Sequence, residues 1–290
     1  MTTALPPPVP GTPDGPWTGG QLTASVRCVL APNSGPMTLD GTNTYLLAEP
    51  GSSHAVVVDP GPDDPDHLDR IAAELAEYDQ RAAVVLLTHG HADHSAGAPR
   101  LARRLGCPVR AVDPQHRLGD EGLADAARLT VAGPEIGVRA TPGHTADSVC
   151  LYVPADGVLL TGDTVLGRGT TVVAHPDGVL SDYLQSLGQL EALAAEHPGL
   201  RLLPGHGPAG APVADVVALS RAPRAQRLAQ LTDAVAGGAR RLDDIVAIVS
   251  PAVARSLGPA ARVTVQAKVE HVVQTAAPRN DADGLSVPGA

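Results

Sequence analysis

Short hydrophobic segments recur along the chain up to about residue 212, and Gly, Pro or Asn residues separate them. Runs of this length with such boundaries predict β-strands. The predicted strands are residues 25–31, 44–48, 55–58, 82–87, 108–112, 129–131, 138–141, 148–153, 158–161 and 200–203. Other segments repeat their apolar residues with the period of a helix. These predicted helices are residues 68–78, 99–105 and 179–197, whereas 113–128 shows no clear pattern.

Alternating strands and helices of these lengths indicate a layered α/β domain, for which we expect residues 21–212. The pattern changes afterwards, because 213–234, 242–249 and 260–275 all have helical periodicity. Residues 213–278 are therefore predicted to form a mostly helical C-terminal region, followed by a tail at 279–290. Residues 1–20 are rich in Pro and Gly and predict an irregular arm, with Trp17 as a possible anchor.

The composition indicates the size of the core and limits the kinds of binding partner. The chain has 290 residues, 43% of them hydrophobic, which is enough for a sizeable core. Phe is absent, so the core must consist mainly of Val, Leu, Ala and Ile. The net charge of −10 and the pI near 5.5 argue against an extended basic surface for duplex nucleic acid, although they allow a local patch.

The spacing of the cysteines and the search for targeting segments bear on the cellular compartment of the protein. Cys28, Cys107 and Cys150 are odd in number and widely spaced, which is typical of buried thiols in a reducing compartment. The first residues do not form a secretory signal, and no apolar run is long enough for a membrane span. We therefore expect a cytoplasmic protein that does not enter the membrane.

The largest cluster of possible metal ligands lies directly after the predicted strand 82–87. There the sequence Thr-His-Gly-His-Ala-Asp-His places three imidazoles and a carboxylate within residues 88–94. Neutral imidazole and carboxylate are the ligands that zinc and similar divalent ions bind. This segment predicts a metal site and, as a working hypothesis, a metal-dependent hydrolase.

Three later segments repeat the same arrangement of a strand, a glycine and a possible metal ligand. Their ligands are His144, Asp163 and His206, each next to a glycine that allows the backbone to bend sharply. Because strand ends converge at one edge of a sheet, we expect all these side chains to meet. Asp59 also ends an apolar strand, and we interpret it either as a turn residue or as a hydrogen-bond acceptor that orients a ligand imidazole.

These motifs resemble those of the metallo-β-lactamase superfamily. The resemblance covers His-x-His-x-Asp-His at 89–94, then His144, Asp163 and His206, with Asp59 as the preceding motif. It implies a four-layer αββα sandwich. It also implies that His89, His91 and His144 hold one metal ion, that Asp93, His94 and His206 hold a second, and that Asp163 bridges the two.

Within the superfamily, the chain resembles the glyoxalase II and nuclease branches. The segments 39–46, 142–145, 169–170 and 204–208 look like those of the lactamase-beta-like endoribonuclease group, which also has a winged-helix-like C-terminal region. That group usually has a His-Arg pair followed by Arg-Glu in the helix after the last ligand. Here Arg221 and Arg224 remain, and the His and the Glu are replaced.

The expected reaction is hydrolysis by water. Two divalent ions a few ångströms apart can lower the pKa of a shared water from about 16 to about 7, so that a metal-bridging hydroxide forms at neutral pH. Asp93 and Asp163 are the predicted catalytic residues, which orient this hydroxide and move its proton. We expect zinc, with manganese or iron as alternatives, because sites of His and Asp accept all three.

Substrate contacts are predicted at three positions. His175 lies in a Gly- and Thr-rich loop after Asp163, where a wall of the substrate site is expected. Arg221 and Arg224 belong to a group of arginines between residues 221 and 241, which forms either a solvated helix face or a patch that binds anions.

Three functions remain open at this point. Single-stranded RNA cleavage agrees with the whole-chain resemblance, but the acidic charge and the 2% of aromatic residues disfavour it. Hydrolysis of a small acyl thioester, as in glyoxalase II, needs the same metals and a smaller anion pocket. A metal-binding protein without catalysis would lack a ligand, and none is missing. An oligomer is not predicted.

Overall fold

The computed structural model describes residues 16–236 except 120, 132 and 175. The chain divides into two compact units, residues 1–223 and 224–290. The first contains two β-sheets and the helices around them. The described part of the second is the latter portion of helix α5 (Val213–Ala236).

The first sheet has six strands in the order β1-β2-β3-β4-β5-β6. Strands β1 to β4 pair antiparallel, whereas β4, β5 and β6 run parallel. The strands are β1 (Gly19–Gln21), β2 (Val26–Leu30), β3 (Asn43–Leu47), β4 (His54–Val58), β5 (Arg81–Leu86) and β6 (Val109–Arg110).

The second sheet has five strands in the order β11-β10-β9-β8-β7. Its strands pair antiparallel except for β10 and β11, which are parallel. They are β7 (Arg128–Thr130), β8 (Glu135–Ala140), β9 (Val149–Val153), β10 (Val158–Gly162) and β11 (Arg201–Pro204).

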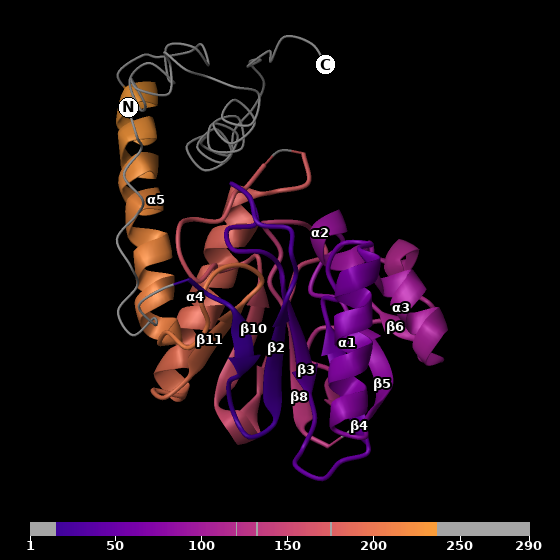
Figure 1. Cartoon of the computed structure of the whole chain (residues 1–290). Helices are drawn as coiled ribbons and strands as arrows, with labels where there is room; N and C mark the ends of the chain where they lie inside the picture. Colours follow the sequence, from indigo (N-terminus) through magenta and orange to yellow (C-terminus); the bar gives the residue numbers. More distant parts are fainter. Residues whose placement is uncertain (1–15, 120, 132, 175, 237–290) are drawn as a thin grey trace. The chain divides into compact units, whose positions relative to one another are not determined.

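Helices cover the outer faces of the two sheets. Figure 1 shows α1 (Pro65–Glu77) and α3 (Ala98–Leu105) beside the first sheet and α4 (Leu180–Glu196) beside the second. The shorter helices are α2 (Ala92–Ser95), η1 (Pro114–His116) and η2 (Pro154–Asp156). The layers therefore follow the order αββα, as the resemblance implied.

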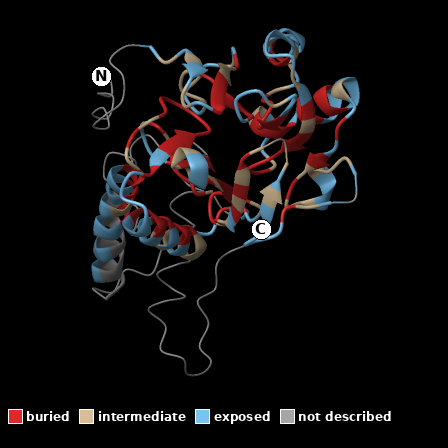
Figure 2. Ribbon diagram, turned by 90° about the horizontal axis from the view of Figure 1, so that it is seen from below, coloured by how far each residue is buried: buried red, intermediate tan, exposed pale blue. Residues whose placement is uncertain are grey.

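The alternation of side chains along the central strands explains this layering. In β4, Val56 and Val58 belong to the hydrophobic cluster between the sheets, whereas Ala55 and Val57 pack in a second cluster with residues of α1 and α3. Successive side chains of a strand point to opposite faces, so a strand buried on both sides is apolar throughout. Figure 2 shows the resulting band of buried residues along the strands.

The structure refines several expectations at the ends of the domain. The first sheet begins with β1, whose first two residues were expected in the N-terminal arm, and Trp17 Nε1 donates a hydrogen bond to Asn43 Oδ1 at 2.7 Å. Residues 114–116 of the segment without a clear pattern form η1. The predicted helix 213–234 is present as α5, whereas residues 1–15, the predicted helices 242–249 and 260–275, the rest of the winged-helix-like region and the tail 279–290 lie outside the described residues.

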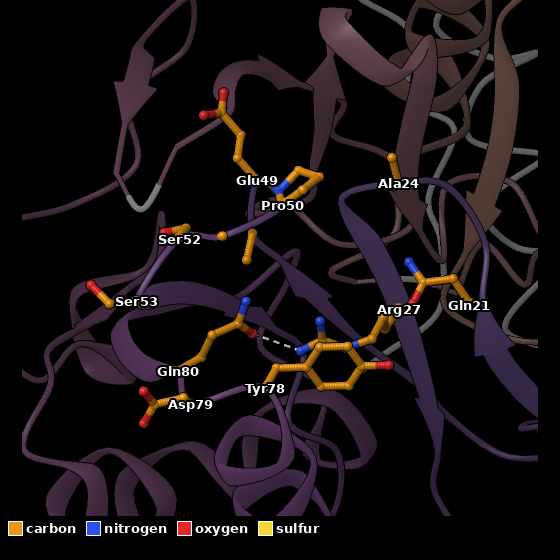
Figure 3. Close-up of a pocket in the computed structure, with 12 residues that line it drawn as sticks. Gln21, Ala24, Arg27, Glu49, Pro50, Ser52, Ser53, Tyr78, Asp79 and Gln80 are labelled. Atoms are coloured by element: carbon orange, nitrogen blue, oxygen red, sulfur yellow. Dashed lines mark hydrogen bonds between the residues drawn. The ribbon is translucent and has the colours of Figure 1, made fainter.

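A pocket of about 450 Å³ lies at the amino ends of β4 and β5 (Figure 3). Arg27 stacks its guanidinium 3.8 Å from the centre of the Tyr78 ring and donates a hydrogen bond to Gln80 Oε1 at 2.7 Å. It also forms an ion pair with Glu74, so it joins β2 to the end of α1. The ligand candidates lie beyond the other ends of these strands.

Two further expectations concern cysteine chemistry and membranes. All three cysteines, Cys28, Cys107 and Cys150, are buried and free. Within the part of the chain that the structure describes, no helix combines the length and the apolar character needed to cross a bilayer.

A buried histidine at the start of α1 makes stability depend on pH. Burial and the nearby Arg70 lower the pKa of His67 to about 4, although Asp64 opposes them. In the unfolded chain its pKa returns to about 6.5, so between pH 4 and 6.5 the unfolded state binds more protons. Stability should therefore fall as the pH drops through this window, by about 3 kcal/mol in all for a shift of this size.

This prediction is checked by urea unfolding of the wild type and of His67→Gln between pH 4 and 7. The wild type should lose stability more steeply than the variant as the pH falls, because glutamine does not titrate. Parallel curves for the two proteins would contradict it.

Candidate metal centre

The loop after β5 carries four of the seven ligand candidates. His89 and His91 lie in the loop itself, and His91 is the N-cap of the short helix α2. Asp93 and His94 follow within α2, which turns them towards the strand ends. One continuous segment therefore supplies side chains to two different groups.

The other three candidates follow β8, β10 and β11, and glycines allow their close approach. Gly162 has a φ of +47°, and a Cβ there would lie 2.4 Å from the Thr88 hydroxyl oxygen. A Cβ on Gly205 would lie 2.6 Å from Asp163 Oδ1. Only glycine lets these two backbone segments approach the histidine loop so closely.

The segment with His206 is also held from β3. Asn43 Nδ2 donates hydrogen bonds to the carbonyl oxygens of Pro204 and Gly207, both at 2.9 Å, and the Tyr45 hydroxyl donates to Pro204 O at 2.7 Å. These polar residues of β3 therefore support the last ligand loop.

The first group consists of His89, His91 and His144. Their ligand atoms, with one nitrogen from each residue, all lie within 4.8 Å of one another. His144 Nε2 is 3.0 Å from His91 Nδ1. Two nitrogens bound to one tetrahedral ion at about 2.0–2.1 Å lie roughly 3.3 Å apart, so the observed spacing suits a shared ion.

The second group consists of Asp93, His94 and His206, again within 4.8 Å. His94 Nε2 is 3.2 Å from His206 Nε2, and Asp93 Oδ2 lies 3.2 Å from the same His206 nitrogen. The spacing is that of the first group, and the donor set contains one carboxylate more.

Asp163 lies between the two groups. Its Oδ2 is 3.7 Å from His144 Nε2 and 3.5 Å from His206 Nε2, and its Oδ1 is 3.5 Å from His94 Nε2. A single carboxylate thus faces imidazoles of both groups, as a bridging ligand must.

Most imidazoles are fixed by a hydrogen bond on the nitrogen that faces away from the group. His144 Nδ1 donates to Val172 O at 2.7 Å, and His206 Nδ1 donates to Gly41 O at 3.1 Å. His94 Nδ1 donates to Asp59 Oδ2 at 2.9 Å. Each bond fixes the proton on Nδ1 and leaves Nε2 free to bind a metal ion.

His89 is oriented through Thr88. The Thr88 hydroxyl donates to Asp59 Oδ2 at 2.6 Å, so its oxygen accepts from His89 Nδ1 at 3.1 Å. The Thr88 backbone N–H donates to Asp59 Oδ1 at 2.8 Å. Asp59 therefore acts as an acceptor for the histidine loop, in addition to its place in the turn before Pro60.

The pKa shifts of the histidines differ between the two groups. Burial lowers the pKa of His89 far below its usual value and also lowers the pKa of His144. Burial acts in the same direction on His206, but the carboxylates of Asp163 and Asp93 outweigh it and raise that pKa to about 9.

His94 and Asp163 shift each other's pKa values. Burial opposes charge on both members, yet Asp163 and Asp59 raise the pKa of His94 well above its usual value. For Asp163, His94 and His206 outweigh burial and hold the carboxyl pKa well below the usual range. The negative charge of the carboxylates therefore favours the protonated forms of His94 and His206.

The donor set fits divalent metal ions. Among the residues that the structure describes, neither of the buried atoms His89 Nε2 and Asp163 Oδ1 has a hydrogen-bond partner. An unpaired buried polar atom is costly, and coordination to a cation would remove that cost. Both orphaned atoms belong to the candidate ligand groups, so the residues present match a metal centre.

The three predicted substrate contacts have different outcomes in the structure. Arg221 forms an ion pair with Glu191 of α4, which accounts for it as a contact between helices. Arg224 belongs to the second unit, and its role stays a prediction. His175 lies outside the described residues.

Sequence analysis missed the acceptors Gly41 O and Val172 O. A backbone carbonyl carries no side-chain signal, so only the folded chain reveals them. Thr88 is the first residue of the Thr-His-Gly-His-Ala-Asp-His motif, and its position between the strand and His89 could have indicated that it orients His89.

Comparison with known proteins places these features in a family. A family model described as the metallo-beta-lactamase superfamily matches residues 37–206. This range contains all seven candidate ligands and Asp59.

Two curated relatives have similar sequences over this part of the chain. The beta-lactamase-like protein 2 homolog of Caenorhabditis elegans is 33% identical over 196 residues, which are 65% of this chain and 63% of the relative. The atrochrysone carboxyl ACP thioesterase of Aspergillus fumigatus is 34% identical over 191 residues, which are 64% of this chain and 57% of the relative. The chain thus matches about three fifths of the length of these proteins.

A solved structure shares the fold over most of the chain. The beta-lactamase domain protein from Burkholderia ambifaria aligns with a TM-score of 0.74 over 92% of each chain. Its sequence identity is 22%, so the likeness concerns the fold alone.

Proposed function

The chain belongs to the metallo-β-lactamase superfamily, and we propose that it is a metal-dependent hydrolase that acts on acyl thioesters with two divalent metal ions. The observation that carries this proposal is the pair of ligand groups joined by Asp163, with imidazoles already oriented by acceptors outside the groups. His89, His91 and His144 would hold one ion, and Asp93, His94 and His206 the other. When bound, the ions activate water and polarise the acyl oxygen.

The two carboxylates have different exposures, which suggests different roles. The Asp163 side chain is 13% exposed and faces both groups, so it holds them together. The Asp93 side chain is 31% exposed, so it can take the proton of the attacking water and pass it to solvent. Water then adds to the acyl carbon, the C–S bond breaks, and the products are a carboxylate, a thiol and a proton.

Zinc is the proposed metal. Four-coordinate zinc binds imidazole and carboxylate, and the spacings of 3.0 and 3.2 Å between ligand nitrogens suit a tetrahedral ion. Manganese and iron remain alternatives, because these ligand types bind all three metals.

An acyl substrate is supported by the surface beside the ligand loops. Met37 is 63% exposed and precedes Leu39, whose side chain lies against Gly207 next to His206. Val179 is 38% exposed, and its backbone N–H donates to Gly143 O beside His144. Exposed apolar side chains near a site favour an apolar ligand over a nucleic acid.

The charged side chains near the ligand loops add little attraction for phosphate groups. Arg168 lies on the segment after Asp163 and forms an ion pair with Asp40 at 2.8 Å. The chain as a whole has a net charge of −10. The thioesterase name of the Aspergillus fumigatus relative points in the same direction.

The test uses zinc-reconstituted protein, with metal content measured by elemental analysis. We expect about two equivalents of zinc per chain, and hydrolysis of acyl thioesters whose kcat/KM rises by up to about fourfold for each added methylene. A labelled unstructured RNA is offered in parallel and should stay intact. Asp163→Ala is the control and should abolish thioester hydrolysis.

Two outcomes would overturn the proposal. RNA cleavage that depends on Asp163, without thioester hydrolysis, would establish a nuclease instead; RNA cleavage that survives Asp163→Ala indicates a contaminant. Well under one equivalent of metal after reconstitution would exclude the metal centre.

A further inference from the structure

A line of hydrogen bonds connects the ligand candidate His94 to the start of helix α1. Its inner half runs from His94 Nδ1 to Asp59 Oδ2 at 2.9 Å. The direction of this carboxylate depends on the backbone of Asp59, which has a φ of +50°. A non-glycine residue rarely adopts this left-handed conformation, so the surroundings must hold it.

The outer half of the line holds the Asp59 backbone. The Thr44 hydroxyl donates to Asp59 O at 2.7 Å, and His67 Nε2 lies 2.9 Å from the same Thr44 oxygen. Thr44 has one hydroxyl proton, which Asp59 receives, so His67 Nε2–H must be the donor to Thr44. Arg70 donates to His67 Nδ1 at 3.2 Å, which agrees with this tautomer.

The members from His67 to His94 are shielded from water. Thr44, Asp59, His67 and His94 are all buried, with exposed fractions between 0% and 2%. The His67 ring also packs against the turn after Asp59, where a Cβ on Gly61 would lie 3.2 Å from Nε2. A lowered pKa of about 4 keeps His67 neutral at physiological pH, so its role as a single donor is stable.

We propose that His67 is a positioning residue for the metal centre. Through Thr44 it holds the left-handed turn at Asp59, and thereby the carboxylate that orients His94. His67 has no contact of this kind with His144, whose Nδ1 is held by Val172 O in the segment between β10 and α4. Asp59 reaches His89 only through Thr88, whereas it contacts His94 directly. The influence of His67 should therefore fall mainly on the ion bound by Asp93, His94 and His206.

This role rests on the proposed function, because His94 matters only if the group binds a metal. The alternative is that His67 merely fills the core where α1 begins. The two roles differ in one respect. A ring of similar size without the Nε2 donor fills the same space, but it leaves Thr44 without a partner on that side.

The test compares His67→Phe, which removes the donor, with His67→Gln, which retains an N–H near the Nε2 position. Thr44→Val breaks the line at the next residue without a large change in volume. Ile71→Val, at a fully buried position of the same helix, is the control for a loss of packing alone. Stepwise zinc binding to each full-length protein is measured by competition with a chromophoric chelator, and urea unfolding is measured alongside.

We expect His67→Phe and Thr44→Val to weaken the binding of one of the two zinc equivalents by up to about tenfold. Loss of a residue that contacts a ligand directly typically costs 10- to 100-fold, and His67 acts at a greater distance. His67→Gln and Ile71→Val should bind both equivalents within about twofold of the wild type.

Three results would overturn the positioning role. These are unchanged zinc binding in a folded His67→Phe variant, an equal loss at both equivalents, and a similar loss in Ile71→Val. If His67→Phe does not fold, Thr44→Val decides, and wild-type zinc binding in that variant overturns the inference. A wild-type protein that binds no zinc would instead refute the proposed function.

Discussion

Replacing Asp163 with asparagine is expected to lower kcat for thioester hydrolysis by at least about 1,000-fold, even with saturating metal. The side chain keeps its shape and loses its charge. Asp163 faces His144, His94 and His206 at 3.5–3.7 Å, so a single neutral amide would leave both groups without their shared carboxylate. This substitution has the largest expected effect on activity.

The measurement is steady-state hydrolysis with metal content determined on the same samples. Asp156→Asn is the matched control, because this half-buried carboxylate lies in η2, at the end of the second sheet away from the ligands, and accepts a hydrogen bond from Ser25. It should keep nearly full activity. A kcat for Asp163→Asn above a tenth of the wild-type value would show that the two groups do not depend on a bridging charge.

Replacing Asp59 with asparagine has the second largest expected effect, because it weakens the acceptor that orients the histidine loop. Asp59 Oδ2 accepts from both His94 Nδ1 and the Thr88 hydroxyl. In asparagine one of the two oxygens becomes an NH₂ donor, and Asp59 Oδ1 already accepts from the Thr88 backbone N–H. In either orientation the amide therefore places a donor opposite a donor, at Thr88 N–H or at His94 Nδ1, and it lacks the charge that strengthens these hydrogen bonds.

We therefore expect Asp59→Asn to weaken zinc binding by about 10- to 100-fold, with a matching loss of activity at limiting metal. Chelator competition measures the affinity. Asp64→Asn makes the same chemical change five residues later at the N-cap of α1, where asparagine caps equally well, and should leave zinc binding unchanged. Equal zinc affinity in both variants would mean that Asp59 only shapes the turn.

The layered fold was predictable because its signal is local. Short apolar runs bounded by Gly and Pro marked most strands of both sheets, and the expected αββα order agrees with the structure. The exception was β1, whose two glycines have no apolar side chains. It forms because Gly19–Gln21 pair with the edge of β2, which is a tertiary interaction.

The substrate contacts were the least predictable part. A row of arginines after residue 220 allowed two interpretations, and only the fold shows that Arg221 pairs with Glu191 thirty positions earlier. The charge of a side chain can be read from the sequence, but its partner depends on which helices pack together.

The candidate ligands that the structure brings together could be picked out in the sequence at residues 89–94, His144, Asp163 and His206, because each stands after a strand, beside a glycine or in a dense histidine motif. Local sequence therefore specified the elements of the fold and the donor chemistry. The tertiary structure decided how those donors are oriented, since Gly41 O, Val172 O and the line from His67 through Thr44 to Asp59 come from distant segments. Backbone carbonyls and buried hydrogen-bond partners leave no trace in composition or periodicity, because their role arises only when the sheets and helices pack.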